Sequence, residues 1–553
     1  MTEMAVIATL TLVFAVAAAL LLATSRTGLP VIPFYLLAGI AIGWAIQEAL
    51  LVELAQWGIA FLVFAFAVEV DPIGGRRVRL DAALIGILQI AITAGLLYGL
   101  SILFGLDPLT ALVVAIAGSL SSTLVALGHL QGQPVRPTVT HERLGETIHF
   151  VEDLIAIGIV LVLSAIVYAE TGAPWRIAVG IGLVLTGFLV RLYLFDRITS
   201  FAGDDVEILM LTGVSLLIGF IALAEAAGIS VVVGAFAAGV AIPYEYPHDI
   251  DTLDAIGYLE DFFVPIFFVT VGALVTFPDL PTLGLALVLY LSVTILNPAI
   301  VAWLALWRDY DSRSATLTGL NLDQISEFSL IIAIEALFFG VIARGVFDAI
   351  VLAAVASMIT STYTHTYGPA LYQRLIDLGV VGSDLDAIAA RSTVPDSIEN
   401  HVLVVGFGPH GQQVVEASHQ AGYETVVIEA DPALIDSVRE AESYHVWGDA
   451  MSASTWELAR PETAALVVST APDRERNRRA IEWAGDVDVI VHADDPAVAG
   501  EYLDAGALFV AVPTLLAGEH VAQHVGRVLT DGEYRNELRE TGRTTVERTV
   551  TEP

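Results

Sequence analysis

The sequence contains no cysteine and no lysine, and these two absences exclude several kinds of chemistry. Without cysteine there is no disulfide, no thiol catalysis and no thiolate metal site, and we expect no resident metal. All 25 basic residues are arginines, against 61 acidic residues, which gives a formal net charge of −36. An acidic surface without lysine suits molar salt, where the Debye length is about 3 Å and self-repulsion is screened. We interpret the composition as that of a salt-accumulating halophile; compositional drift in a GC-rich genome is the alternative. No nucleic acid is expected among the partners.

The chain is far more apolar than a soluble protein. Its 553 residues are 56% hydrophobic, with a mean hydropathy of +0.73, which predicts a polytopic α-helical protein of the lipid bilayer. Runs of about 20 apolar residues can cross a hydrocarbon layer of roughly 30 Å. Thirteen such runs are centred near residues 14, 38, 61, 93, 118, 157, 185, 216, 236, 268, 294, 328 and 358. The first run has no basic flank, so we expect a spanning helix there and not a cleaved signal.

The arginines predict the orientation of these spans, because positive charge accumulates on the cytoplasmic side. Twelve arginines lie in the loops that follow odd-numbered spans, and only Arg176 and Arg344 follow even-numbered ones. This asymmetry predicts a cell-membrane protein with its N-terminus outside and its C-terminal part in the cytoplasm.

The composition changes near residue 375, where a soluble domain is expected to begin. Residues 375–553 hold 31 acids and 12 arginines. Strand and helix patterns alternate there, which predicts a Rossmann-like α/β domain with a parallel sheet. We expect a membrane domain over 1–374, a linker over 375–399, a nucleotide-binding domain over 400–530 and a charged tail over 531–553.

The sixth apolar run opens with titratable residues that share one helix face. Glu142, Glu146, His149 and Asp153 stand at i, i+4, i+7 and i+11, so on a helix they form one stripe about 16 Å long. The predicted orientation makes this stripe a proton or cation path from the cytoplasm towards the bilayer centre. Glu142 and Glu146 are also compatible with a plain helix start at the interface, whereas an acid as deep as Asp153 indicates function. Glu152 lies about 100° away from Asp153 and is expected to reach a neighbouring helix or a second ligand position.

Two other apolar runs carry clusters of polar residues. The fifth run contains SLSST and the twelfth contains NLDQISE. Where a helix is interrupted, freed carbonyls and hydroxyls supply hard oxygen ligands for alkali cations. The candidate partners of Asp153 are therefore Ser119, Ser121, Ser122 and Thr123 in the fifth run and Asn321, Asp323, Gln324, Ser326 and Glu327 in the twelfth.

Five motifs in a consistent order carry a family resemblance. They are SSTLVALGHL, FVED with its apolar run, GISVVVGAFAAGVAI, FFVTVGALV and DQISEFSLII. Together they resemble the monovalent cation:proton antiporter-2 family, and within it the Kef-type potassium transporters, over about residues 5–525. The resemblance implies a secondary antiporter, not an enzyme: a homodimer of thirteen-helix protomers with an inverted repeat and two broken helices, here the fifth and twelfth spans.

The same resemblance implies roles for particular residues. Asp153 matches the aspartate that binds the cation or the proton, and Thr123 and its serine neighbours match the segment that lines the cation site. Glu152 stands where potassium-type members commonly have Gln and sodium/proton exchangers have Asp. Electrogenic relatives carry a lysine in the eleventh span, where this chain has Asn297, so we expect electroneutral exchange of K⁺ or Na⁺ for protons, with K⁺ favoured.

The soluble domain opens with a dinucleotide fingerprint. Gly406, Gly408 and Gly411 form GFGPHG directly after the strand HVLVV, and Glu429 ends the next strand. Glycines there permit a tight turn and the approach of a pyrophosphate to a helix N-terminus, while an acid such as Glu429 binds ribose hydroxyls. Asp431 either shares that role or caps the next helix.

This segment also resembles the RCK (TrkA-like) N-terminal domain, in which WGDA, here with Asp449, lines the adenine. The resemblance implies NAD(H) or another adenine nucleotide as a regulator; an empty Rossmann-like site is the alternative. Two other functions stay open: a nucleotide-gated potassium efflux pathway without obligatory proton coupling, and a membrane-anchored NAD-dependent oxidoreductase.

Overall fold

The computed structural model describes residues 3–24, 30–68, 76–128, 140–170, 175–195, 197, 206–242, 250–382, 388–389, 392–431, 434–441, 443–471, 473–493, 495–531, 534–535 and 538. The chain divides into two compact units, Met1–Gly382 and Ser383–Pro553. The expected boundaries at 374, 399 and 530 stay predictions, and most of the expected charged tail lies outside the described residues.

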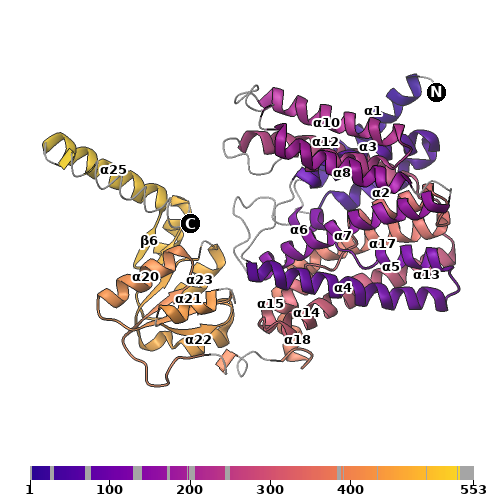
Figure 1. The fold of residues 1–553 in the computed structure, drawn as a ribbon. Coiled ribbons are helices and arrows are strands. Elements are labelled where there is room, and N and C mark those ends of the chain that lie inside the picture. The colour runs from indigo at the N-terminus through magenta and orange to yellow at the C-terminus, as the bar shows by residue number, and fades with distance from the viewer. Residues whose placement is uncertain are drawn as a thin grey trace. The chain divides into compact units, whose positions relative to one another are not determined.

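The first unit is helical (Figure 1). Its first elements are α1 (Glu3–Thr24), α2 (Ile32–Ile42), the 3₁₀ turn η1 (Gly43–Ala45), α3 (Glu48–Val68), α4 (Arg76–Leu103), α5 (Pro108–Ala117), α6 (Thr123–Gly128), α7 (Thr140–Glu170) and α8 (Trp175–Tyr193). There follow α10 (Val206–Ala226), α11 (Val231–Val240), α12 (Ile250–Ala273), α13 (Leu280–Leu291), the π-turn η2 (Ser292–Leu296), α14 (Asn297–Trp307), α15 (Ser312–Leu320), α16 (Glu327–Phe338), α17 (Arg344–Thr366) and α18 (Gly368–Asp377).

Six helical stretches in the described part are long and apolar enough to cross a membrane: Ile7–Thr24, Glu48–Val68, Leu80–Leu103, Trp175–Tyr193, Leu280–Trp307 and Arg344–Thr366. Shorter apolar helices lie between them. The α8 helix exposes most of its apolar surface, including Leu185, Phe188 and Leu192, as expected of a helix that faces lipid. The chain is therefore a multi-pass membrane protein, and the count of thirteen spans stays a prediction.

The helices form two groups by their packing. In the flanking group, which comprises α1, α2, α3, α8, α10, α11 and α12, the α12 helix packs on α2 and α3, and α11 packs on α3, α8 and α10. In the crossing group, which comprises α4–α7 and α13–α17, the α7 helix packs on α4, α15 and α16, and α16 also packs on α5 and α17. The contacts between the two groups include those of α2 with α17 and of α7 with α8.

Glycines allow some of these helices to approach closely. A Cβ atom on Gly39 of α2 would lie 2.1 Å from the carbonyl oxygen of Val269, and one on Gly272 of α12 would lie 2.1 Å from that of Leu36. Only the absence of a side chain permits such backbone contact. The flanking group is thus tightly packed between α2 and α12.

The second unit is a six-stranded parallel sheet in the order β3-β2-β1-β4-β5-β6. Its strands are β1 (His401–Val405), β2 (Thr425–Glu429), β3 (Tyr444–Trp447), β4 (Ala464–Ser469), β5 (Val489–His492) and β6 (Phe509–Ala511). The connections contain α20 (Pro409–Gln420), α21 (Ile435–Glu440), α22 (Ala453–Ala459), the 3₁₀ turn η4 (Pro461–Thr463), α23 (Arg474–Trp483) and α24 (Pro496–Asp504), and α25 (Pro513–Thr530) follows β6.

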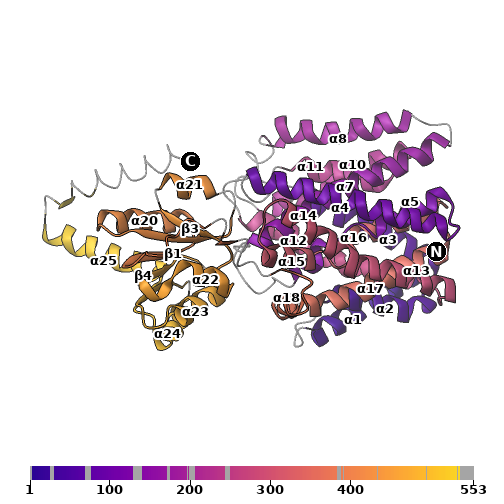
Figure 2. The same ribbon diagram turned by 90° about the horizontal axis from the view of Figure 1, so that it is seen from below.

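Helices cover both faces of this sheet, with α20 and α21 on one and α22, α23 and α24 on the other (Figure 2). The alternation of β1 matches this arrangement: Val402 and Val404 join one apolar cluster, and Leu403 and Val405 join the other. Period-2 alternation sends successive side chains to opposite faces. The expected Rossmann-like architecture is confirmed, and the strand order reverses between β1 and β4, where such sheets bind ligands.

Candidate functional site: carboxylates at the crossing of two broken helices

Two interrupted helices meet in the crossing group. The α5 helix stops before Gly118 and α6 begins at Thr123, while α15 stops at Leu320 and α16 begins at Glu327. The two interruptions run antiparallel, because Ser121 pairs with Ile325 and the Ser326 N–H donates to the Leu120 carbonyl at 3.1 Å. This crossing is what the family resemblance implied for the fifth and twelfth spans.

Polar side chains bind backbone groups that the interruptions release. Gln89 of α4 donates to the Ser119 carbonyl at 2.9 Å, and Gln324 donates to the Ser122 carbonyl at 3.0 Å. Asn297, which begins α14 after the π-turn, lies 3.5 Å from the Gly118 carbonyl. Backbone outside regular structure is tolerated at membrane depth only when it finds such partners or lines a polar cavity.

The acids of α7 reach this crossing. Glu152 accepts a hydrogen bond at 2.8 Å from the Ser121 N–H and a second, short one from the Ser121 hydroxyl. Asp153 accepts one from the Thr123 hydroxyl at 2.6 Å. Neighbours in sequence therefore bind Ser121, inside the interruption, and Thr123, which begins α6, and the angle of about 100° between them on the helix makes this possible.

A third carboxylate joins them from the other broken helix. Glu327, the first residue of α16, accepts a hydrogen bond from the Leu124 N–H at 3.3 Å. Because Leu124 follows Thr123, the side chains of Asp153 and Glu327 both converge on the start of α6. Glu152, Asp153 and Glu327 are each no more than 2% exposed.

These three carboxylates have no basic partner among the described residues, whose ion pairs all lie elsewhere. One oxygen of each, Oε1 of Glu152, Oδ1 of Asp153 and Oε2 of Glu327, also has no hydrogen-bond donor in the described part. A buried carboxylate left uncompensated is costly, so it takes up a cation or a proton. The crossing can therefore bind a small cation or protons through oxygen atoms.

The other residues predicted for this site differ in their contacts and in their burial. His149 is buried one turn before Asp153, and Ser122 caps the start of α6 by accepting from the Val125 N–H at 3.2 Å. Gln324 lies at the crossing, and Asp323 accepts a hydrogen bond from Thr364 of α17. Glu142 and Glu146 lie earlier on α7 and are only partly buried.

The nucleotide fingerprint folds as a tight turn between β1 and α20. Gly406 has φ +91°, which favours glycine. A Cβ atom on Gly411 would lie 2.1 Å from the Gly406 carbonyl oxygen, whereas one on Gly408 would meet nothing within 4 Å. The turn thus needs Gly406 and Gly411, and it leaves open space at Gly408 and at the start of α20.

Glu429 lies at the end of β2 beside this turn. Its carboxylate accepts hydrogen bonds from the N–H groups of Phe407 at 2.7 Å, Ala430 at 2.7 Å and Asp431 at 2.8 Å. Burial, which removes water from around the charged form, raises the pKa of Glu429 above its usual range, and these N–H donors oppose that rise. The acid therefore holds the turn and the next loop together at the sheet edge expected to bind ribose.

Asp449 lies just after β3 and is 1% exposed. Its carboxylate accepts from the Met451 N–H at 2.9 Å and lies 3.7 Å from the guanidinium of Arg476 on α23. The sequence alone did not single out this ion pair, although Arg476 belongs to a conspicuous basic run in an acidic domain.

A comparison with family models decides the identity of the membrane unit. The model described as "Sodium/hydrogen exchanger, transmembrane" matches residues 11–366, and the model described as "TrkA-N domain" matches residues 402–513. The chain belongs to the sodium/hydrogen exchanger family. This match confirms the resemblance drawn from the five motifs. The membrane unit of this exchanger is a cation/proton antiporter, and a TrkA-N domain follows it in the chain.

Individual proteins agree with this family assignment. The exchanger is 26% identical to the glutathione-regulated potassium-efflux system protein KefC of Enterobacter sp. (strain 638), over 86% of this chain and 76% of that protein. It is 27% identical to KefC of Klebsiella pneumoniae subsp. pneumoniae, over 84% and 75%. A solved sodium proton antiporter from Methanocaldococcus jannaschii covers 68% of this chain with a TM-score of 0.51 and 13% identity, which shows a shared fold. These relatives are transporters.

Several polar contacts of the exchanger escaped the sequence analysis. Ser357 and Ser361 of α17 bond the Ile325 N–H and the Gln324 amide at 3.1 and 2.9 Å. On α4, buried Asp81 pairs with Arg308, whose Nε lies 2.9 Å from Oδ1. Polar residues in apolar runs, such as Gln89 in LQIAIT and the hydroxyls of SMITSTYTHT, were the available signal.

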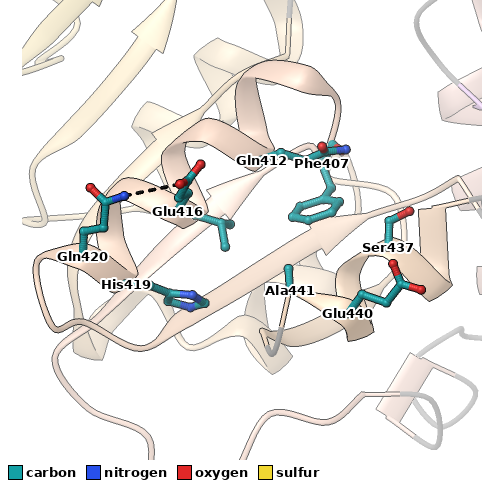
Figure 3. A pocket seen from close by; sticks show the side chains of 9 residues that line it. Phe407, Gln412, Glu416, His419, Gln420, Ser437, Glu440 and Ala441 are labelled. Atoms are coloured by element: carbon teal, nitrogen blue, oxygen red, sulfur yellow. Dashed lines mark hydrogen bonds between the residues drawn. The ribbon is translucent and has the colours of Figure 1, made fainter. Parts of the chain in front are cut away.

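A separate hollow of the exchanger lies between α20 and α21 (Figure 3). It has a volume of about 670 Å³ and is lined by Phe407, Gln412, Val415, Glu416, His419, Gln420, Ser437, Glu440 and Ala441. Phe407 comes from the glycine turn, so the hollow adjoins the expected nucleotide site from the α20 side. His419 is bound to Thr425 at 2.9 Å and Glu416 to Gln420 at 3.3 Å.

Proposed function

We propose that this exchanger moves K⁺, or less readily Na⁺, against protons through Asp153. The observation that carries the proposal is the meeting of three buried carboxylates, without a basic partner in the described part, at the crossing of two broken helices. The preference for K⁺ rests on the relatives named potassium-efflux systems.

Transport follows from competition for one carboxylate. Asp153 binds either a dehydrated cation or a proton, with the Thr123 hydroxyl beside it and freed backbone carbonyls nearby as further oxygen ligands. A neutral site crosses the bilayer at far lower cost than a charged one, so the crossing group moves only when it is loaded. Movement of the crossing group past the flanking group would expose the site to each side in turn.

We expect electroneutral exchange, because the chain has no lysine and Asn297 takes the place of a cationic partner. Asn297 instead lies against the Gly118 carbonyl. An uncharged amide neither repels a bound cation nor carries a charge of its own through the cycle.

The TrkA-N domain is proposed to bind NAD(H) or another adenine nucleotide and to regulate transport. The turn formed by Gly406, Gly408 and Gly411, the acid Glu429 and the reversal of strand order fit a dinucleotide. Asp449 and Asp431 are the further candidates for adenine and ribose contacts. Binding of the nucleotide would change the conformation of this domain and thereby regulate transport.

The proposed orientation places the N-terminus outside and the TrkA-N domain in the cytoplasm, as the arginines predict. We propose a homodimer as well. The exposed apolar residues of α25, which are Leu515, Leu516, Val521, Val525 and Leu529, support an additional contact surface in the second unit.

Reconstitution into high-salt liposomes with an internal pH dye tests the function. Addition of K⁺ or Na⁺ outside wild-type vesicles should release protons from inside, and Asp153→Asn should reduce that release at least a hundredfold. Cation-driven proton movement retained in Asp153→Asn would refute the role of Asp153. Cation flux without proton movement in the wild type would instead indicate a gated efflux pathway.

A further inference from the structure

A fourth buried carboxylate lies away from the crossing. Glu335 follows Glu327 by eight residues on α16 and is 5% exposed. At 1.5 Å per residue the two are about 12 Å apart along the helix axis. Glu335 therefore occupies the opposite end of α16, in its last turn before Phe338, and the exchange mechanism above does not use it.

The surroundings of Glu335 are almost entirely apolar. Its helix neighbours Ile331, Ile334 and Ala336 are fully buried. Its one side-chain hydrogen bond within the described part is donated by the Ser230 hydroxyl at 3.4 Å, the long end of the range. That hydroxyl also accepts from the Val232 N–H at 3.2 Å as the N-cap of α11. Such a carboxyl is most stable when it carries a proton.

No basic side chain of the adjoining helices compensates Glu335 within the described residues. The α5 and α11 helices contain no titratable residue. The buried acids of α7 lie at the crossing, and on α17 Asp348 accepts from Thr276 at 2.5 Å while Arg344 donates to the Leu274 carbonyl at 2.8 Å. The other titratable groups of α7 and α17 are His141, Glu142, Arg143, Glu146, His149, Tyr168, Glu170, Tyr363 and His365.

The contact between Glu335 and Ser230 joins the two helix groups. Glu335 belongs to α16 of the crossing group, whereas Ser230 begins α11 of the flanking group. Any sliding of one group past the other therefore breaks this hydrogen bond. In the orientation that the arginines predict, the end of α16 and the start of α11 both face the outside.

We propose that Glu335 is a second proton-binding residue of the exchanger, which exchanges its proton with the outer water whenever its contact with Ser230 opens. When the groups separate, the carboxyl gives a proton to outer water and the carboxylate is hydrated. To close again it must take a proton back, because the ionised form would be buried without a partner. Proton binding at Glu335 thus sets how readily the outer side closes. The proposal rests on the antiport proposed above.

The test is the dependence of exchange on external pH in oriented liposomes held at constant internal pH. In wild type we expect a dependence on both external and internal pH. Glu335→Gln, which is always neutral, should remove one of the two titrations that Asp153 and Glu335 give to the external pH profile, and it should leave the internal pH profile unchanged. Glu335→Asp should retain the external dependence, and Glu225→Gln, an exposed acid of α10, should match the wild type.

Ser230→Ala provides an independent variant that keeps the carboxylate. Loss of the hydroxyl should shift the midpoint of the external profile about fivefold in proton concentration, as expected for a hydrogen bond between neutral groups. An external profile unchanged in both Glu335→Gln and Ser230→Ala would overturn the proposal. If Glu335→Gln does not fold, Ser230→Ala and Glu335→Asp decide it. Absence of exchange in the wild type would overturn the antiport itself.

Discussion

The acids of the membrane unit are held by hydroxyls and backbone N–H groups. Glu152 binds Ser121, Asp153 binds Thr123, and Glu335 binds Ser230. These weak, neutral donors leave a carboxylate able to take up and release a cation or proton, whereas a guanidinium would keep it charged and paired. Among the described residues of the membrane unit, the buried Asp81 is instead paired with an arginine, Arg308.

Glu429 provides a prediction at the residue scale for the TrkA-N domain. Burial raises its pKa, so the neutral form becomes populated at a higher pH than for an exposed glutamate. A neutral carboxyl is a poorer acceptor for ribose hydroxyls. Binding of NADH should therefore be strongest well above that pKa and should weaken as pH falls through it.

Titration of the full-length protein with NADH between pH 5 and pH 8 measures this effect. Glu429→Gln should bind about 10- to 150-fold more weakly at pH 8, since a hydrogen bond to a charged group contributes roughly 1.5–3 kcal/mol, and it should lose the pH dependence. An affinity in Glu429→Gln that still falls at low pH would assign the dependence to another group.

At the scale of elements, the functional geometry depends on turns and interruptions. The gaps between α5 and α6 and between α15 and α16 bring helix ends to one place. The turn between β1 and α20 likewise leaves free backbone groups at the start of α20, where we expect the nucleotide to bind. In each case a short non-helical segment supplies backbone groups that a continuous helix would consume internally.

The two glycines of the β1–α20 turn give a matched pair of variants. Gly411→Ala forces a Cβ atom against the Gly406 carbonyl and should destabilise the TrkA-N domain by about 1–3 kcal/mol. Gly408→Ala has open space and φ −65°, so the fold should remain as stable as in wild type. Thermal unfolding and proteolysis of the full chain measure both. Equal stability of the two variants would contradict this account of the turn.

At the scale of the whole membrane unit, transport requires the two helix groups to move against each other. Phe66 of α3, in the flanking group, packs against Phe150 of α7 and Phe328 of α16 in the crossing group, with ring centroids 6.4 and 5.1 Å away. These rings must separate or slide during each cycle if the groups alternate in exposing the site.

The absence of native cysteine allows a direct test. In the double variant Phe66→Cys with Phe150→Cys, a short thiol cross-linker should lower the exchange rate more than tenfold, and cleavage of the linker should restore the rate. A control pair inside the flanking group, Phe14→Cys with Phe262→Cys at a centroid distance of 5.0 Å, should cross-link without loss of exchange. Full activity of the cross-linked Phe66–Phe150 pair would exclude movement between the groups.

Much of the site was predictable because burial of polar residues is costly in a membrane. Asp153, Glu152 and Glu327 stood out as acids inside apolar runs, and the glycine fingerprint with Glu429 stood out by spacing. The sequence analysis also grouped Asp323 with this site; its side chain bonds Thr364 of α17, and its role stays a prediction. Gln89, Ser357 and Ser361 went unnoticed because isolated amides and hydroxyls are common in membrane helices as packing residues.

The sequence by itself determined that the chain lies in the membrane, which family it belongs to and where its dinucleotide fold begins, because apolar run length, motif order and strand–turn–helix spacing are local properties. Only the tertiary structure decided which distant groups meet: Ser121 with Glu152, the start of α6 with Glu327, and Ser230 with Glu335. Such pairings depend on how separate helices pack, and no periodicity within one helix contains that information.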